Sequence, residues 1–294
     1  MSNRPVGIGI IGSGGIAQSV HLPAYEKLQE EGKVKIVAVS DANEETAKAA
    51  AEKFKVPHSF MDYKQMLELD SIDAIDICTP NFLHKQPTVD AFNAGKHVIV
   101  EKPLAINAVE GQEMLEASRR AGKKFQVALN MRYGSGPQAI KRFIRDGKLG
   151  DIYYARAHAL RRRGIPGWGV FTQKDKQGGG PLIDIGVHIL DLTLWLMDYP
   201  EPKSVSGMTY TKFGTREGVI GLMGQWDPKI YTVEDFAVGL VRFKNGSTLT
   251  LESSFVANIE RDAFTTSVMG TEGGAHLDPF NNANTKIFRE ESGS

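Results

Sequence analysis

The first 129 residues alternate short apolar, β-branched runs with amphipathic stretches of helical length. Such alternation is typical of a parallel sheet whose strands are connected by helices. We predict strands at residues 6–11, 35–40, 74–79, 97–101 and 125–129. We predict helices at residues 16–30, 44–54, 63–69, 83–94 and 108–121. The pattern therefore indicates an N-terminal α/β domain of the Rossmann, dinucleotide-binding type.

The pattern changes after residue 130. A helix is predicted at residues 138–145 and a strand at 152–160, and the glycine-rich loop 178–181 precedes an apolar helix at 182–197. Strand-like alternation follows at 202–210, 235–244 and 247–255, with a hairpin turn at Asn245-Gly246. Because 294 residues exceed one comfortable core, we predict two domains, 1–124 and 125–294. The second is an α+β domain with a mainly antiparallel sheet and a helix on one face.

Charge and cysteine content restrict the partners. Lys and Arg number 35, and Asp and Glu also number 35, so no net positive field would hold nucleic acid or an anionic membrane. Neither a leader nor a membrane-spanning apolar segment is evident, and no His and Cys spacing suggests a metal site. The single cysteine, Cys78, fits a reducing compartment. We therefore expect a cytoplasmic protein that binds a small molecule and has no metal.

The turn after the first predicted strand matches the G-x-G-x-x-G/A pattern, and a predicted helix follows it. Gly12 permits the tight turn, Gly14 lets backbone approach a pyrophosphate, and Ala17 keeps helix and strand close. The helix N-terminus would then face the phosphates. A glycine turn in a ligand-free α/β domain is the alternative. The predicted cofactor contacts of this turn are Gly12, Gly14, Gly15, Ile16 and Ala17.

An acidic side chain, Asp41, follows the second predicted strand, where such a residue binds the adenosine ribose hydroxyls. Its carboxylate would repel a 2′-phosphate, and the next residues, Ala42 and Asn43, supply no cation for one. We therefore predict NAD as the cofactor, with NADP as the alternative. Asp41 could also cap the next helix, a role that is compatible with ribose binding.

Polar residues also follow the strand predicted at 74–79. Ligands in open α/β sheets bind at the carboxyl ends of strands, so Thr79, Pro80 and Asn81 are predicted to line the dinucleotide. We place His84 at a helix start or at the cofactor edge. Cys78 is interpreted as a packed small residue, since nothing nearby in sequence would activate its thiol.

Two motifs carry groups that could move a proton. Lys102, in Glu101-Lys102-Pro103, follows a predicted strand and could bind a substrate oxygen and exchange a proton with it. Asp184 and His188 lie four residues apart, on one face of the predicted helix. Neutral histidine is a suitable base for a hydroxyl proton, and we expect the glycine-rich loop before the pair to be mobile. A surface lysine, a capping aspartate and a packed core histidine are the alternatives.

In this order and approximate spacing, the motifs resemble the Gfo/Idh/MocA oxidoreductases, named for glucose-fructose oxidoreductase and inositol 2-dehydrogenase. The resemblance covers essentially the whole chain. It implies a second domain with a large open sheet that forms the interface of a homodimer or homotetramer. It also implies that Lys102, Asp184 and His188 bind the reacting hydroxyls, that His188 or Lys102 relays the proton, and that Glu101 and Lys102 contact the cofactor. A cis peptide bond at Lys102-Pro103 is expected.

The function predicted from these residues is hydride transfer between nicotinamide and a secondary hydroxyl of a sugar, anhydrosugar or cyclitol. The alternatives are an NAD-dependent glycoside hydrolase that oxidises its substrate transiently, an aldehyde-forming or imine-reducing enzyme, and a non-catalytic nucleotide-responsive regulator. The candidate substrate contacts are Arg132, Tyr133, Arg163 and Trp168, because aromatic rings stack on sugars and guanidinium groups bind hydroxyls. For the arginines, a solvated charge run is the alternative. Family members usually continue beyond residue 294, so a truncated C-terminus is an alternative to a natural one.

Overall fold

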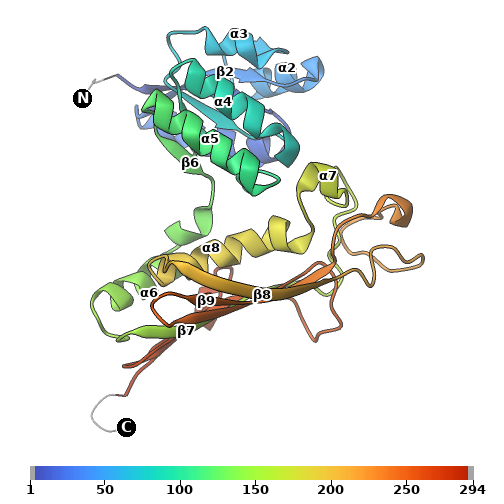
Figure 1. Cartoon of the computed structure of the whole chain (residues 1–294). Coiled ribbons are helices and arrows are strands. Elements are labelled where there is room, and N and C mark those ends of the chain that lie inside the picture. Colours follow the sequence, from blue (N-terminus) through green and yellow to red (C-terminus); the bar gives the residue numbers. More distant parts are fainter. Residues whose placement is uncertain (1–3, 291–294) are drawn as a thin grey trace. The chain divides into compact units, whose positions relative to one another are not determined.

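The computed structural model describes residues 4–290 and divides into two compact units, Met1–Ala128 and Leu129–Ser294 (Figure 1). The division predicted after residue 124 is therefore too early. Strand β6 (Phe125–Val127) pairs in parallel with β5 (His97–Val100), and this pairing places it in the first sheet.

The first unit contains a parallel sheet with the strand order β3-β2-β1-β4-β5-β6. All five predicted strands are present, and β3 was not predicted because three residues carry little periodicity. The strand order reverses between β1 and β4, and ligands bind open α/β sheets at such a reversal, at the carboxyl ends of the strands. The strands are β1 (Val6–Ile11), β2 (Val34–Ser40), β3 (His58–Phe60), β4 (Ala74–Ile77), β5 (His97–Val100) and β6 (Phe125–Val127).

Two apolar clusters form the core of this unit, and alternate residues of β1 enter different clusters. Ile8 and Ile10 pack with Leu22, whereas Ile11 packs with Phe92 and Met114. The helix predicted at 16–30 is a π-helical turn that continues as an α-helix. The helical segments are η1 (Ala17–His21), α1 (Leu22–Glu30), α2 (Glu44–Lys53), α3 (Tyr63–Leu67), η2 (Asn81–Leu83), α4 (Lys85–Asn93) and α5 (Ala108–Ala121).

The second unit contains a sheet in the order β13-β12-β11-β7-β10-β9-β8. Within the described residues of this second sheet, only the β7 and β10 pair is parallel, so the predicted mainly antiparallel sheet is confirmed. The last three strands were not predicted. The strands are β7 (Ile152–Leu160), β8 (Pro202–Tyr210), β9 (Phe236–Phe243), β10 (Thr248–Ser254), β11 (Ala263–Gly270), β12 (Gly274–Leu277) and β13 (Lys286–Phe288).

Helices of the second unit bury one face of this sheet. Helix α8 contacts β7 and β11 and runs along the sheet in Figure 1. Its buried side chains, among them Ile189, Leu192 and Leu196, belong to the single apolar core of the unit. The helical segments are η3 (Asn130–Tyr133), α6 (Ser135–Arg145), α7 (Lys174–Gln177), η4 (Leu182–Gly186), α8 (Val187–Leu196), η5 (Pro228–Ile230) and η6 (Asn282–Asn284).

One helical run within residues 4–290, Lys174–Leu196, is long and apolar enough to cross a membrane by length and composition alone. The sequence prediction had recognised no such segment. The run has 23 residues, and its most apolar window of 18 residues has a mean hydropathy of 1.2 and is 61% buried inside the protein. Core helices of soluble proteins share these properties, and the packing of α8 on the sheet is of that kind.

Candidate active site

A cavity of about 750 Å³ lies in the first unit at the carboxyl ends of β1, β2 and β4. Its wall includes five of the predicted cofactor contacts, from three loops that are distant in sequence: Gly12, Gly14, Asp41, Thr79 and Pro80. The other residues of the glycine turn are placed differently. Gly15 and Ile16 are exposed, and Ala17 is fully buried in the core beneath the turn. The loop after β3 adds Met61, Asp62 and Tyr63, which the sequence did not single out because β3 itself escaped prediction.

Two glycines of the turn serve different purposes. Gly12 has a φ of 87°, and a Cβ placed there would lie 2.8 Å from the carbonyl carbon of Cys78. A Cβ placed at Gly14 would meet nothing within 4 Å. Gly12 therefore permits the close approach of β1 to the end of β4, whereas Gly14 leaves open space in the cavity wall for a pyrophosphate.

Asp41 accepts hydrogen bonds from two backbone amides. Ser13 N donates to Oδ2 and Asn43 N donates to Oδ1, both at 3.0 Å. Asn43, rather than Asp41, caps α2 by accepting a hydrogen bond from Thr46 N. The capping alternative for Asp41 is therefore wrong, and its carboxylate lies in the cavity wall, next to the glycine turn.

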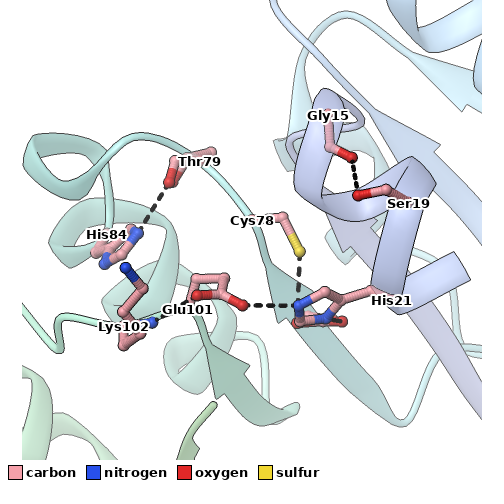
Figure 2. Close-up of polar contacts among 9 residues, drawn as sticks. Gly15, Ser19, His21, Cys78, Thr79, His84, Glu101 and Lys102 are labelled. Atoms are coloured by element: carbon pink, nitrogen blue, oxygen red, sulfur yellow. Dashed lines mark hydrogen bonds and ion pairs between the residues drawn. The ribbon is translucent and has the colours of Figure 1, made fainter. Parts of the chain in front are cut away.

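A buried imidazole that the sequence did not single out connects β4 with the end of β5. His21 Nδ1 lies 2.7 Å from Asp76 Oδ2, and Nε2 lies 2.8 Å from Glu101 Oε1 (Figure 2). Burial opposes a charge on His21, but hydrogen bonds to Asp76, Cys78 and Glu101 outweigh it and raise the pKa of His21 to about 12. Burial likewise opposes ionisation of Glu101, yet the imidazolium lowers the pKa of this carboxyl group. The arrangement is thus an imidazolium between two carboxylates.

The same neighbourhood contains donors that could hold a metal ion. One ligand atom each of His21, Asp76 and Cys78 lies within 4.8 Å of the others, although the sequence showed no metal-ligand spacing. Residues 21 and 76 are 55 positions apart, so only the fold brings them together. Both nitrogens of His21 contact carboxylates, and burial raises the pKa of the Cys78 thiol to about 12. Since metals bind thiolates, this geometry favours the ion-paired network.

His84 directly precedes α4, in agreement with the predicted helix start, and it is fully buried and does not line the cavity. Its Nδ1 lies 2.8 Å from Pro103 O and its Nε2 2.9 Å from Thr79 O. Burial lowers the pKa of His84, although the carbonyl oxygens favour the charged ring. The expected cis peptide bond between Lys102 and Pro103 is present.

In the second unit, Asp184 lies in the π-helical η4 and His188 in the first turn of α8. π-Helical turns inside helices are frequent at functional sites. Asp184 is buried and His188 is half-buried. The end of the loop before them is hydrogen-bonded to the Glu234 carboxylate, and its expected mobility stays a prediction. Gly180 N and Leu182 N donate to this group at 2.9 and 3.3 Å.

The four candidate substrate contacts fall into two kinds. Tyr133 and Trp168 are 67% and 53% exposed, so their rings remain accessible for stacking. The guanidinium of Arg132 is instead bound by both carboxylate oxygens of Asp191. The guanidinium of Arg163 donates to backbone carbonyl oxygens and to a neighbouring amide side chain. Both arginines therefore use some of their five N–H donors inside the second unit, and their predicted contact with substrate hydroxyls stays a prediction.

Comparison with known proteins identifies the class. Residues 6–129 match the model of an oxidoreductase family with an NAD-binding Rossmann fold, and residues 138–276 match the Gfo/Idh/MocA C-terminal domain. The chain belongs to the Gfo/Idh/MocA oxidoreductase family, which confirms the resemblance found in the sequence. The first unit is accordingly an NAD-binding domain.

Similar proteins include sugar dehydrogenases. D-Glucoside 3-dehydrogenase of Escherichia coli (strain K12) is 39% identical over 95% of this chain and 79% of its own. Levoglucosan dehydrogenase of Pseudarthrobacter phenanthrenivorans (strain DSM 18606 / JCM 16027 / LMG 23796 / Sphe3) is 30% identical over 80% of this chain and 63% of its own. A structure of levoglucosan dehydrogenase with NADH and levoglucosan has a TM-score of 0.86 and 26% identity, covering 98% of this chain and 78% of that one.

Proposed function

We propose that this protein is an NAD-dependent dehydrogenase that transfers a hydride between nicotinamide and a secondary hydroxyl of a sugar, anhydrosugar or cyclitol. The observation that carries the proposal is the position of Lys102. It follows β5, the neighbour of β4, and β4 ends at the nucleotide cavity. The similarity to D-glucoside 3-dehydrogenase and levoglucosan dehydrogenase supports a carbohydrate substrate.

NAD would be held by Gly12, Gly14 and Asp41, and Thr79 and Pro80 also line the cavity. When bound, it supplies the acceptor for the hydride. The open space at Gly14 and the carboxylate at the end of β2 fit such a dinucleotide.

The remaining chemistry is the removal of the hydroxyl proton. We assign this step to Lys102, Asp184 and His188. An ammonium group stabilises a developing alkoxide, a neutral imidazole accepts a proton, and a carboxylate orients a hydroxyl. These roles follow from the family resemblance and from the chemistry of the side chains.

The test is NADH formation by the purified chain with glucose, a methyl glucoside, levoglucosan and myo-inositol, repeated with NADP. Lys102→Ala and His188→Ala should each lower turnover by about a hundredfold or more and leave NAD affinity nearly unchanged. Lys48→Ala, which changes an exposed lysine of α2, is the matched control. Full activity of Lys102→Ala would refute this assignment. Glycoside cleavage without accumulated NADH would favour a hydrolase, and NAD binding without any turnover would favour a regulator.

We also propose a cytoplasmic location and a homodimer or homotetramer formed through the sheet of the second unit. The one cysteine, a buried free thiol, supports the first proposal. Exposed apolar side chains on β8, Val205 at 70% and Met208 at 61%, support the second. A monomer in analytical ultracentrifugation would contradict the oligomer, and secretion of the native protein would contradict the location.

A further inference from the structure

Residues 101–103 are held on both flanks by imidazole rings. On one flank, His21 contacts Glu101, and on the other flank, His84 contacts the carbonyl oxygen of Pro103. In the view of Figure 2, Glu101 lies between Lys102 and the His21 ring, and the His84 ring is drawn above Lys102. Each ring also reaches the neighbouring strand end, because His21 contacts Asp76 of β4 and His84 contacts the carbonyl that follows this strand. Both rings thus connect the segment that carries Lys102 to the end of β4.

The connection through His21 is electrostatic. The side chains of His21 and Asp76 are 11% and 1% exposed, and that of Glu101 is 13% exposed, so little water screens their charges. Glu101 binds His21 through Oε1, and its Oε2 accepts a hydrogen bond from Lys102 N at 2.9 Å. A charge-assisted chain therefore runs from β4 to the backbone of Lys102.

The connection through His84 is mechanical. The residue is fully buried, and the first turn of α4 fixes it, since Thr88 Oγ1 donates to His84 O at 2.7 Å. Burial lowers the pKa of His84, so the ring is neutral at neutral pH and donates one hydrogen bond at a time. It can therefore donate to only one of the carbonyl oxygens of Thr79 and Pro103 while its other nitrogen lies against the second, and it adds no charge between them.

We propose that His21 and His84 are positioning residues for Lys102: together they fix residues 101–103 against the end of β4, and the charge on His21 balances the carboxylates beside the lysine. The proposal rests on the proposed function only in that Lys102 is the group whose position and protonation matter for turnover. Neither histidine is required to touch the substrate.

The charges around His21 set the direction of the expected effects. The groups that face it are Asp76 and Cys78 at the end of β4, Glu101 after β5, and Tyr25 of α1 through its interaction with Asp76. Loss of the imidazolium leaves the carboxylates of Asp76 and Glu101 without their cation. Loss of the Glu101 charge leaves the imidazolium with Asp76 alone. The two losses therefore change the net charge beside Lys102 in opposite directions.

The experiment compares His21→Gln, Glu101→Gln and His84→Asn with the native chain in kcat, KM and the pH profile of kcat/KM. We expect each variant to lower kcat by about tenfold or more. The descending limb of the profile should move by about one pH unit, to higher pH in His21→Gln and to lower pH in Glu101→Gln. His84→Asn should leave the limb in place, because it removes no charge. His58→Gln, the same type of change at an exposed imidazole of β3, is the matched control for His21.

The proposal is overturned if this limb of the pH profile moves in the same direction in His21→Gln and Glu101→Gln, or if it moves in neither variant. If His21→Gln does not fold, Glu101→Gln alone still tests the sign. Hydrogen exchange at the Lys102 amide separates this proposal from the proposed function. Faster exchange in Glu101→Gln and His21→Gln than in His58→Gln supports positioning even where no sugar is oxidised, and unchanged exchange refutes it. Absence of turnover in the native chain refutes only the dehydrogenase.

Discussion

Substitution of Gly12 and Gly14 by alanine should separate folding from cofactor binding, although the two glycines are only two residues apart. At Gly12, alanine would have to adopt a φ of 87°, which costs about 1–2 kcal/mol. Its Cβ would also lie 2.8 Å from the carbonyl carbon and oxygen of Cys78 and 2.9 Å from Thr79 N. These are backbone atoms that cannot rotate away, so overpacking adds about 1–3 kcal/mol. We expect Gly12→Ala to destabilise the first unit by about 2–5 kcal/mol.

Gly14→Ala should behave in the opposite way. The added Cβ meets no protein atom within 4 Å, and the residue has no positive φ, so its effect on stability should stay within about 1 kcal/mol. The methyl group would instead enter the cavity space that we assign to the pyrophosphate. NAD affinity should therefore fall by about tenfold or more.

The assay combines calorimetric unfolding of the full chain with NAD titration. Gly12→Ala should lower the midpoint of the first unit's transition by about 6 °C or more, whereas Gly14→Ala should leave it nearly unchanged. Gly15→Ala is the matched control, because it too meets nothing within 4 Å but lies outside the cavity wall. The reasoning is refuted if Gly12→Ala melts like the native chain, or if Gly14→Ala binds NAD as tightly as Gly15→Ala does.

Two further predictions concern charged groups of the first unit. Asp41→Ser should raise the affinity for NADP relative to NAD, because it removes the carboxylate that repels a 2′-phosphate. An unchanged ratio of the two affinities in paired titrations would show that Asp41 does not recognise the ribose. The stabilisation by the charged His21 is complete below the unfolded pKa of 6.5 and is lost as the pH rises toward the folded pKa of about 12. The stabilisation by the ionised Glu101 carboxylate is present above its unfolded pKa of 4.5 and is lost as the pH falls through the lowered folded pKa. The difference in unfolding free energy between the native chain and His21→Gln should thus be largest near pH 5–6 and shrink above pH 6.5, by at most about 1.4 kcal/mol per pH unit, and a pH-independent difference in urea unfolding would contradict the imidazolium.

Much of the first unit could be predicted because its signals are local. The apolar run of β1 and the glycine turn each depend on neighbours within a few residues. The carboxyl ends of parallel strands meet at one edge, so Asp41 and Thr79 could be assigned to one cavity without knowledge of their contacts. The chemistry of the nucleotide pocket was therefore accessible from strand ends alone.

The second unit was harder to predict because its decisive contacts span long sequence separations. Glu234 lies 54 residues from Gly180, and its carboxylate accepts a hydrogen bond from the Gly180 backbone amide. No residue near the glycine loop in sequence indicates this contact. Arg132 lies 59 residues from Asp191, so its sequence neighbours did not show that its donors are used inside the protein. Composition and motif position describe what a side chain can bind, whereas the fold determines which partner reaches it first.

The network of His21, Asp76 and Glu101 also depends on contacts between residues that are distant in sequence. The charges of its members explain why these residue types occur together. Asp76 in β4 is almost fully buried, and a buried carboxylate without a partner is strongly destabilising. The imidazolium of His21 compensates the charge of Asp76. Glu101, at the end of β5, forms a second ion pair with the same imidazolium. Removal of one of these three charged side chains is thus expected to lower the free energy of unfolding more than replacement of all three by apolar residues. In the sequence, His21 is one polar residue of a predicted helix, and Asp76 is a charged residue in an apolar strand. The contacts of His21 with Asp76 and Glu101, next to Lys102, explain why a charged residue is buried in β4.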